Sequence, residues 1–167
     1  LVCLVGSEMC IRDSLERNKT FEYQIFEKKN SIDLTDGYGI QLSVNSIKLL
    51  HKVGFNKLNT SNLYFPKKVN FFNARDLKKI CDIDLSKFND QNNFYTTLKR
   101  SNLIEFLLSG IPENKLFFNC DLVDIQNKNR ISLCFRNNEI KEFDYLVASD
   151  GIYSKTKQIL FKKEGLP

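Results

Sequence analysis

The sequence has little histidine, no closely spaced cysteine pair and no long apolar run. Its one histidine, His51, gives no support to Ser-His-Asp chemistry or to a histidine-rich metal site. The five cysteines are widely spread and include no CxxC pair, which favours reduced thiols in a cytoplasmic protein. No apolar stretch approaches the roughly 18 to 20 residues of a membrane span. The first residues also lack the basic and long apolar regions of a secretory signal.

The composition is that of a globular domain. The 167 residues are 42% hydrophobic and 27% charged, which is enough for one domain with its own core. The formal net charge is +5, a sign also found in proteins that bind nucleic acid or anionic surfaces. However, the chain is rich in Asn, Lys, Ile and Phe, whose codons are AT-rich, and its lysines are scattered among acidic residues. A solvated surface is therefore favoured over a nucleic-acid footprint.

The first fourteen residues, LVCLVGSEMCIRDS, have two interpretations. They resemble a strand that runs into the start of a phosphate-binding turn at Gly6. Back-translation supplies the second: CTC GTG GGC TCG GAG ATG TGT ATA AGA GAC encodes residues 4–13 and matches a transposase-type sequencing adapter. We therefore expect residues 1–14 to be an adapter artefact and authentic protein to begin near Leu15. The native cysteines are then the remaining three.

Three segments have the pattern of helices. Each has a residue suited to cap its start: Ser43 or Asn45 for residues 43–55, Ser101 for residues 100–112, and Ser154 for the last helix. The first helix is expected to end at Gly54, and the second at Gly110 and Pro112.

Strand-like runs alternate with these helices. Residues 21–26 are aromatic and β-branched, and residues 56–95 contain short aromatic patches typical of short strands and loops. KLFFNCDLVDI, RISLCFRN and IKEFDYLVAS are three further strand candidates, and the apolar run YLVAS (145–149) is expected to be a buried strand. This order favours an α/β layered domain with an attached meander. A fold class follows from it, but a function does not.

Three blocks of the sequence carry a resemblance to a known family. FEYQIFEKKNSIDLTDGYGIQLSVNSIKLLHKVGF, YTTLKRSNLIEFLL and FDYLVASDGIYSKTKQIL follow one another between about Phe21 and Leu160. They resemble successive blocks of the FAD-dependent aromatic hydroxylases, which include p-hydroxybenzoate, salicylate and ubiquinone-pathway hydroxylases. These blocks are a strand-ending Glu, a GxGIxLxPNAxxxLxxLG stretch, an Arg that opens a helix, and a DxxxxADGxxSxxR motif. The resemblance implies an FAD/NAD(P)-binding, Rossmann-like three-layer α/β fold with a β-meander and the beginning of a β-rich substrate domain.

The resemblance also implies roles for particular residues, beginning with three in the first two blocks. Glu27 would accept hydrogen bonds from the ribose hydroxyls of FAD. Gly39 would let the backbone approach the cofactor closely, because a Cβ would intrude there. Arg100 would face the FAD phosphates with its forked donors. Taken alone, a strand-ending Glu or an Arg beside Lys99 is more simply an exposed surface residue.

Three further cofactor contacts are implied nearer the C-terminus. Leu122 would meet the adenine through its backbone. Asp150 and Gly151 would lie near the pyrophosphate and serve the passage of the nicotinamide cofactor, although Asp-Gly is also an ordinary hairpin turn. No catalytic residue and no metal ligand is predicted. Three positions depart from the family pattern: Val44 replaces Pro, Ser149 replaces Ala, and Lys157 replaces Arg.

The implied activity is that of an NAD(P)H-using, FAD-dependent monooxygenase. In such enzymes O2 adds at the flavin C4a, and the resulting hydroperoxide hydroxylates an aromatic ring, here a phenol-like or quinone-precursor substrate. The implied partners are a small aromatic substrate and O2, with no nucleic acid and no transmembrane segment. A lipid quinone precursor would bring peripheral membrane association. Two alternatives stay open: a non-oxygenating flavoprotein oxidoreductase or halogenase of the same fold, and a basic α/β binding module.

Parts of the family pattern have no counterpart in the sequence. GxGxxG occurs nowhere, and the later Gly-Asp motif and most of a substrate domain are also missing. We therefore expect an incomplete chain that binds FAD poorly by itself. The expected division is an artefact at 1–14, an FAD-binding domain at 15–57 and 98–162, a substrate-domain excursion that begins at 58–97, and a linker to a missing C-terminal region at 163–167.

Overall fold

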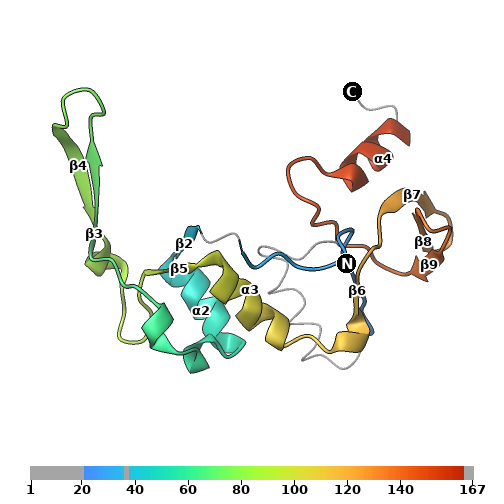
Figure 1. Cartoon of the computed structure of the whole chain (residues 1–167), viewed down its shortest axis with the longest axis horizontal. Helices are drawn as coiled ribbons and strands as arrows, with labels where there is room; N and C mark the ends of the chain where they lie inside the picture. The colour runs from blue at the N-terminus through green and yellow to red at the C-terminus, as the bar shows by residue number, and fades with distance from the viewer. Residues whose placement is uncertain (1–20, 36–37, 164–167) are drawn as a thin grey trace. The chain divides into compact units, whose positions relative to one another are not determined.

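The computed structural model describes residues 21–35 and 38–163. The expected adapter segment lies outside these residues, as does the expected linker 163–167 apart from Lys163, which ends a helix. The chain divides into two compact units, one built from residues 21–33 and 109–163 and the other from residues 34–108 (Figure 1). These limits differ from the expected domain limits, and the assignment of residues 58–97 to a substrate domain stays a prediction.

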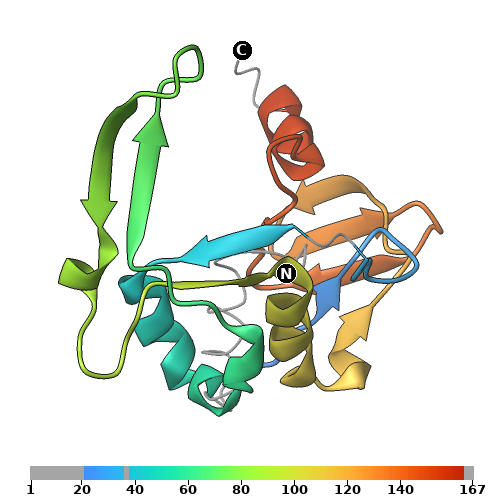
Figure 2. The same cartoon turned by 60° about the vertical axis from the view of Figure 1, so that its left-hand side comes forward.

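The first unit combines a short parallel pair with an antiparallel meander. Strand β1 (Ile25–Phe26) pairs in parallel with β6 (Leu116–Phe117), which follows the 3-10 turn η4 (Glu113–Lys115). Strands β7 (Leu122–Asn127), β8 (Ile131–Phe135) and β9 (Ile140–Phe143) lie side by side in sequence order (Figure 2). Helix α4 (Lys155–Lys163) closes the unit and contacts β7. The expected meander is therefore confirmed.

A cluster of apolar side chains forms the core of this unit. Phe26 is fully buried, and its ring centre lies 5.0 Å from that of Phe135 and 5.6 Å from that of Phe117. Leu133 and Phe135 alternate along β8 and so point to the same face, and Ile159 of α4 packs against the same cluster. Burying each large side chain stabilises the fold by about 1.5–3 kcal/mol. Packing of this kind holds β1 and α4 on the meander.

The second unit contains two helices and two strand pairs. Strand β2 (Gly39–Leu42) is antiparallel to β5 (Thr96–Lys99), and β3 (Lys68–Phe72) is antiparallel to β4 (Lys79–Asp84). The helices are α2 (Val44–Lys52) and α3 (Arg100–Ser109). The 3-10 turns are η1 (Phe55–Lys57), η2 (Thr60–Asn62) and η3 (Leu85–Phe88). Residues 56–95 thus form short strands and loops, as expected.

The starts of the helices test the capping predictions. Ser43 caps α2, since its Oγ accepts a hydrogen bond from the Ser46 N–H at 3.4 Å. Ser154 caps α4, since its Oγ accepts from the Lys157 N–H at 2.9 Å. The prediction for the second helix was wrong, because α3 begins at Arg100 and Ser101 lies inside it. The Arg100 N–H donates instead to the Tyr38 carbonyl at 3.1 Å, so the helix satisfies an early amide without a side-chain cap.

The expectation of a buried strand at residues 145–149 was also wrong. Strand β9 ends at Phe143, only Ala148 forms a β-bridge in the run, and Tyr145 is 80% exposed. An apolar sequence becomes a strand only where its backbone groups pair with a neighbour. Across residues 21–35 and 38–163, the parallel sheet has two strands. The α/β class is confirmed, while the three-layer Rossmann arrangement stays a prediction.

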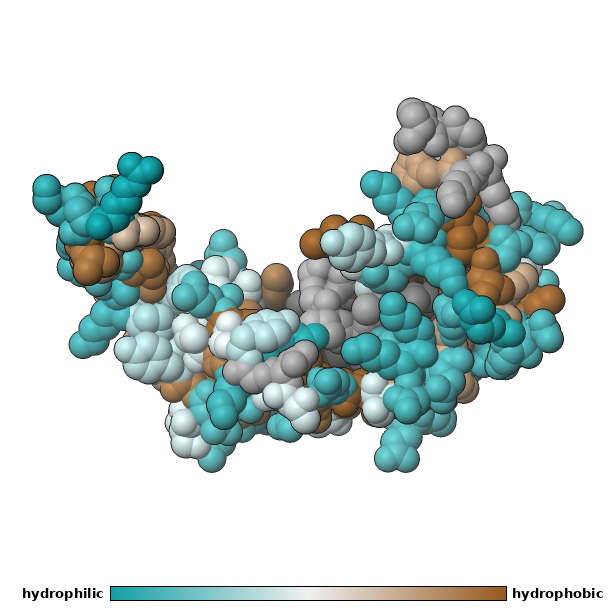
Figure 3. All heavy atoms as spheres, turned by 45° about the horizontal axis from the view of Figure 1, so that its top comes forward, coloured by the Kyte–Doolittle hydropathy of each residue, from teal (hydrophilic) through white to brown (hydrophobic). Residues whose placement is uncertain are grey.

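The β3–β4 hairpin is amphipathic. Directly opposed residues share a face, and one face carries only apolar or weakly polar side chains: Val69 and Ile83, Phe71 and Cys81. Phe71 is 45% exposed and Ile83 is 43% exposed, and apolar surface is visible on the hairpin at the left of Figure 3. On the other face, Asp82 lies 2.6 Å from Lys79 Nζ and 3.0 Å from Lys68 Nζ.

No helix within the described ranges is long and apolar enough to cross a bilayer.

Candidate functional site

Glu27 lies at the carboxyl end of β1, with its backbone held on both sides. Its N–H donates to the Phe117 carbonyl at 2.8 Å, and its carbonyl accepts from the Cys120 N–H at 2.9 Å. One carboxylate oxygen, Oε1, accepts from the Lys29 N–H at 3.0 Å. The other oxygen has no hydrogen-bond partner among the described residues, and the side chain is half-buried. Glu27 therefore lies at the carboxyl end of a parallel strand, with one carboxylate oxygen unpaired among the described residues.

Leu122 has its side chain buried in the core of the first unit. It begins β7, is 5% exposed, and belongs to the same core cluster as Phe26. The hydrogen bond between the Cys120 N–H and the Glu27 carbonyl joins the approach to Leu122 to the end of β1. The structure therefore brings the Glu27 and Leu122 segments together.

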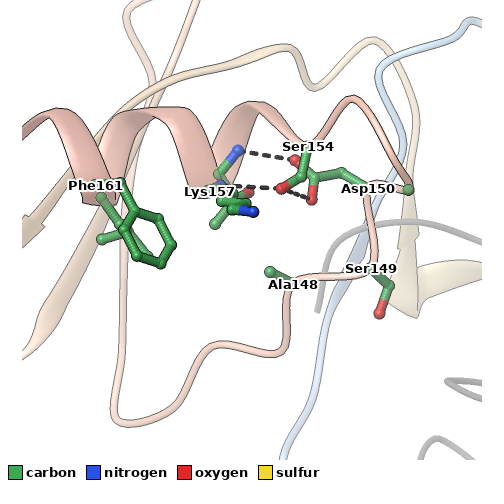
Figure 4. A pocket seen from close by; sticks show the side chains of 9 residues that line it. Ala148, Ser149, Asp150, Ser154, Lys157 and Phe161 are labelled. Atoms are coloured by element: carbon green, nitrogen blue, oxygen red, sulfur yellow. Dashed lines mark hydrogen bonds between the residues drawn. The ribbon is translucent and has the colours of Figure 1, made fainter. Parts of the chain in front are cut away.

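Asp150 is part of the cap of α4. Its Oδ1 accepts from the Ser154 hydroxyl at 2.5 Å, and its Oδ2 accepts from the Thr156 N–H at 2.8 Å. Figure 4 shows the Asp150 and Ser154 side chains pointing toward each other, with Ser154 also bonded to Lys157. Partial burial raises the pKa of Asp150, but the hydrogen bonds from Ser154 and Thr156 outweigh burial and leave this pKa below its usual value. The carboxylate is thus held in its charged form at the helix start, where negative charge is favourable.

An open pocket of about 500 Å³ lies beside this cap. The Asp150–Gly151 turn and Lys157 form its polar side, and Leu160 and Phe161 line the rest (Figure 4). The Lys157 Nζ lies 5.5 Å from the centre of the Phe161 ring, so this cation, which stands in place of the family's Arg, contacts an aromatic face. The Ser149 hydroxyl is buried without a hydrogen-bond partner in the part of the chain that the structure describes.

The two predicted glycines differ in what requires them. Gly151 has a φ of +78°, and a Cβ there would meet nothing within 4 Å, so its backbone conformation and not its surroundings calls for glycine. Gly39 lies in β2 at an ordinary φ. A Cβ at Gly39 would meet the Thr97 Cγ2 at 3.8 Å and the Leu98 carbonyl oxygen at 3.9 Å, which are normal contacts. Neither packing nor conformation in the described chain explains the glycine at position 39.

Arg100 and Gly39 are neighbours in the second unit. Gly39 pairs with Lys99 across the β2–β5 ladder, and Arg100 follows directly. The guanidinium carbon of Arg100 lies 5.7 Å from the centre of the Tyr38 ring, which is within the range of a cation–π contact. No carboxylate pairs with Arg100 among the residues that the structure describes. Tyr38 was not predicted, although its place directly before Gly39 in GYGIQL was the available signal.

The six predicted residues thus fall into two groups. Glu27, Leu122, Asp150 and Gly151 belong to the first unit, and Gly39 and Arg100 belong to the second.

Asp121 of the first unit was not predicted either. Its carboxylate accepts from Arg136 Nε at 2.7 Å and from Lys155 Nζ at 3.0 Å. Within residues 21–35 and 38–163, no group of His, Cys, Asp and Glu side chains is arranged to hold a metal ion.

Comparison with known proteins finds similarity to flavin-dependent enzymes. No family model matches the chain. A flavin-dependent monooxygenase of Legionella longbeachae is 28% identical over 78 residues, which cover 46% of this chain and 20% of that protein. The FAD-dependent monooxygenase dpasE of Apiospora sacchari is 26% identical over 156 residues, which cover 87% of this chain and 31% of that protein. The chain is similar in sequence to FAD-dependent monooxygenases. The resemblance inferred from the sequence motifs is therefore confirmed.

The chain also shares its fold with a hydroxylase of known structure. The structure of a salicylate hydroxylase substrate complex matches it with a TM-score of 0.77 and 16% identity, over 99% of this chain and 38% of that one. At this identity the match shows the fold alone. The chain spans about a fifth to a third of the length of the two curated relatives it matches.

Proposed function

We propose that the chain is part of an FAD-dependent monooxygenase that uses NAD(P)H and O2 to hydroxylate an aromatic substrate. The observation that carries the proposal is the similarity to an FAD-dependent monooxygenase over 87% of the chain. The position of Glu27 at the carboxyl end of a parallel strand supports it, because this is where nucleotide cofactors bind in such sheets.

The chemistry of the predicted residues fits the parts of FAD. Glu27 has a carboxylate oxygen without a partner in the described chain, which suits vicinal ribose hydroxyls. Arg100 is a cation that no described carboxylate neutralises, which suits a phosphate. Among the described residues, no contact and no backbone conformation requires glycine at position 39, which suits close approach of a ligand to the backbone. In this proposal Leu122 contacts the adenine through its backbone, and Asp150 and Gly151 lie near the pyrophosphate.

FAD, when bound, supplies the oxygen-activating chemistry. The residues of this chain bind and orient it. For a monooxygenase of this type, a phenol-like ring or a quinone precursor is the substrate class that we propose. The salicylate hydroxylase structure with the same fold supports an aromatic substrate.

The test uses the full-length protein of which this chain is a part. We expect it to copurify with FAD and to oxidise NAD(P)H faster when a phenol is added, with an atom from isotopically labelled O2 found in the product. Retention of FAD without oxygen incorporation would identify a non-oxygenating flavoprotein. Purification without flavin, together with no binding of added FAD, would refute the proposal.

Two variants test the binding residues, and a third serves as a matched control. Glu27→Gln and Arg100→Gln remove one charge each and should weaken FAD binding. Asp144→Asn removes the carboxylate of an exposed ion pair with Arg130, whose Nε lies 3.0 Å from Asp144 Oδ1. This control should bind FAD as the unmodified protein does. Equal affinities in all four proteins would rule out the assigned contacts.

A further inference from the structure

Asp121 joins two parts of the first unit that are far apart in the chain. Its Oδ2 accepts from the Nε of Arg136, the residue that follows β8, at 2.7 Å. Its Oδ1 accepts from the Nζ of Lys155, the first residue of α4, at 3.0 Å. The Arg136 N–H also donates to the Asp121 carbonyl at 2.9 Å. Both carboxylate oxygens and the backbone of Asp121 are thus engaged, with partners 15 and 34 residues away.

The α4 end of this link adjoins the cap that holds Asp150. Ser154, directly before Lys155, accepts from the Lys157 N–H and donates to the Asp150 carboxylate. On one side, the first turn of α4 is therefore connected to the meander by the hydrogen bonds of Asp121 with Lys155 and Arg136. On its other side it is bonded to the Asp150–Gly151 turn through Ser154. A shift of this turn relative to β7 would move Asp150 with it.

Ordinary surface ion pairs contribute little, so the setting of Asp121 matters. Its side chain is 31% exposed, against 71% for Asp144, which pairs with Arg130. Asp121 also follows the buried Cys120 and precedes the buried Leu122, so its backbone is fixed by the core. By contrast, the Arg130–Asp144 pair has no ion-pair partner among the described side chains of α4.

We propose that Asp121 is a positioning residue that fixes the first turn of α4 against the β7–β8 pair and thereby sets the placement of Asp150 and Gly151. Its importance for FAD rests on the proposed function, because only there do Asp150 and Gly151 approach a cofactor. The placement itself is a property of this chain without any ligand. Ile159 of the same helix packs against the core. The competing explanation is therefore that apolar packing alone holds α4 in place.

Amide hydrogen exchange on the full-length protein without added FAD separates these explanations. Asp121→Asn removes the negative charge and one of the two acceptor oxygens, and Lys155→Met removes the ammonium donor but keeps the apolar stem of the lysine. Both changes weaken the link. We expect the protection of the Thr156 and Lys157 amides to fall roughly two- to fivefold in each, the range expected for one partly exposed ion pair. The amide of Leu133, in the centre of the meander, should keep its protection. Lys155→Arg should retain protection at the start of α4, because it preserves the charge and donors.

The matched control is Asp144→Asn, which removes an aspartate charge from an ion pair that does not include α4. It should leave the Thr156 and Lys157 amides unchanged. The positioning role is overturned if Asp121→Asn and Lys155→Met leave these amides as protected as Asp144→Asn does. It is also overturned if the Leu133 amide loses protection in parallel, since that would indicate general destabilisation.

A flavin titration of the full-length protein distinguishes this inference from the proposed function. Weaker α4 protection in Asp121→Asn, with FAD affinity unchanged in both Asp121→Asn and Asp150→Asn, would support the positioning role and contradict the cofactor contact of Asp150. Weaker FAD binding in Asp150→Asn, with α4 protection unaffected by Asp121→Asn, would support the cofactor contact and overturn the positioning role.

Discussion

Replacement of Gly39 by alanine should weaken FAD binding in the full-length protein without destabilising the fold. The added Cβ would meet its nearest neighbours, Thr97 Cγ2 and the Leu98 carbonyl oxygen, at 3.8 and 3.9 Å. These are ordinary contact distances, and the backbone at Gly39 is not left-handed. Alanine is therefore expected to stabilise the chain slightly, by about 0.4–1 kcal/mol, because it restricts the unfolded state.

The expected loss of affinity comes from the ligand side. A methyl group inserted into a well-packed contact costs about 1–3 kcal/mol. This cost corresponds to roughly a 5- to 150-fold increase in the dissociation constant for FAD. Fluorescence titration of the apoprotein with FAD measures this loss, and thermal unfolding measures stability. An unchanged dissociation constant in Gly39→Ala would refute the close approach of the cofactor to this backbone.

Gly151→Ala is the matched comparison for stability. Gly151 has a φ of +78° with open space around it, so alanine there adds backbone strain of about 1–2 kcal/mol. That strain should lower the midpoint of thermal unfolding of the full-length protein. A fall of the same size in Gly39→Ala would show that the fold, and not a bound cofactor, requires glycine at position 39.

Three further predictions concern the cofactor and the helix cap. Glu27→Gln should reduce the FAD affinity of the full-length protein while the melting temperature stays within a few degrees, as titration and thermal unfolding can show. Residues 15–167 expressed alone should purify without stoichiometric FAD, and a yellow protein with equimolar flavin would contradict this. Because the pKa of Asp150 is lowered by folding, its stabilising contribution is fully present above its ordinary pKa of about 3.9 and is lost as pH falls through the lower folded pKa. NMR of the Thr156 amide should show this transition, and the Asp150→Asn variant should lack it.

Features that depend on neighbouring residues in the chain could be predicted from the sequence. Ser43 and Ser154 cap their helices through bonds to residues three positions ahead, which makes the signal local. RISLCFRN was likewise predicted to be a strand, and it contains β8. The motifs around Glu27, Arg100 and Asp150 indicated the flavoprotein resemblance, because each motif is a short run of adjacent residues.

Other features depend on partners that are distant in sequence. The first amide of α3 is satisfied by the carbonyl of Tyr38 on another strand, so Ser101 was not needed as a cap. Residues 145–149 are apolar enough for a strand, but they join no sheet of the described residues, and propensity alone does not create a strand partner. No local pattern marks Asp121, because its partners lie 15 and 34 residues along the chain.

The sequence by itself determined the α/β class, the capped helices α2 and α4, and the family resemblance. Each of these depends only on the order and spacing of residues that are close together in the chain. Only the tertiary structure decided that Gly39 and Arg100 are neighbours across the β2–β5 ladder. It also showed that the Leu122 side chain is buried in the core and that Asp121 ties α4 to the meander. The physical reason is that hydrogen bonds and ion pairs between distant segments form only after the core has brought those segments together.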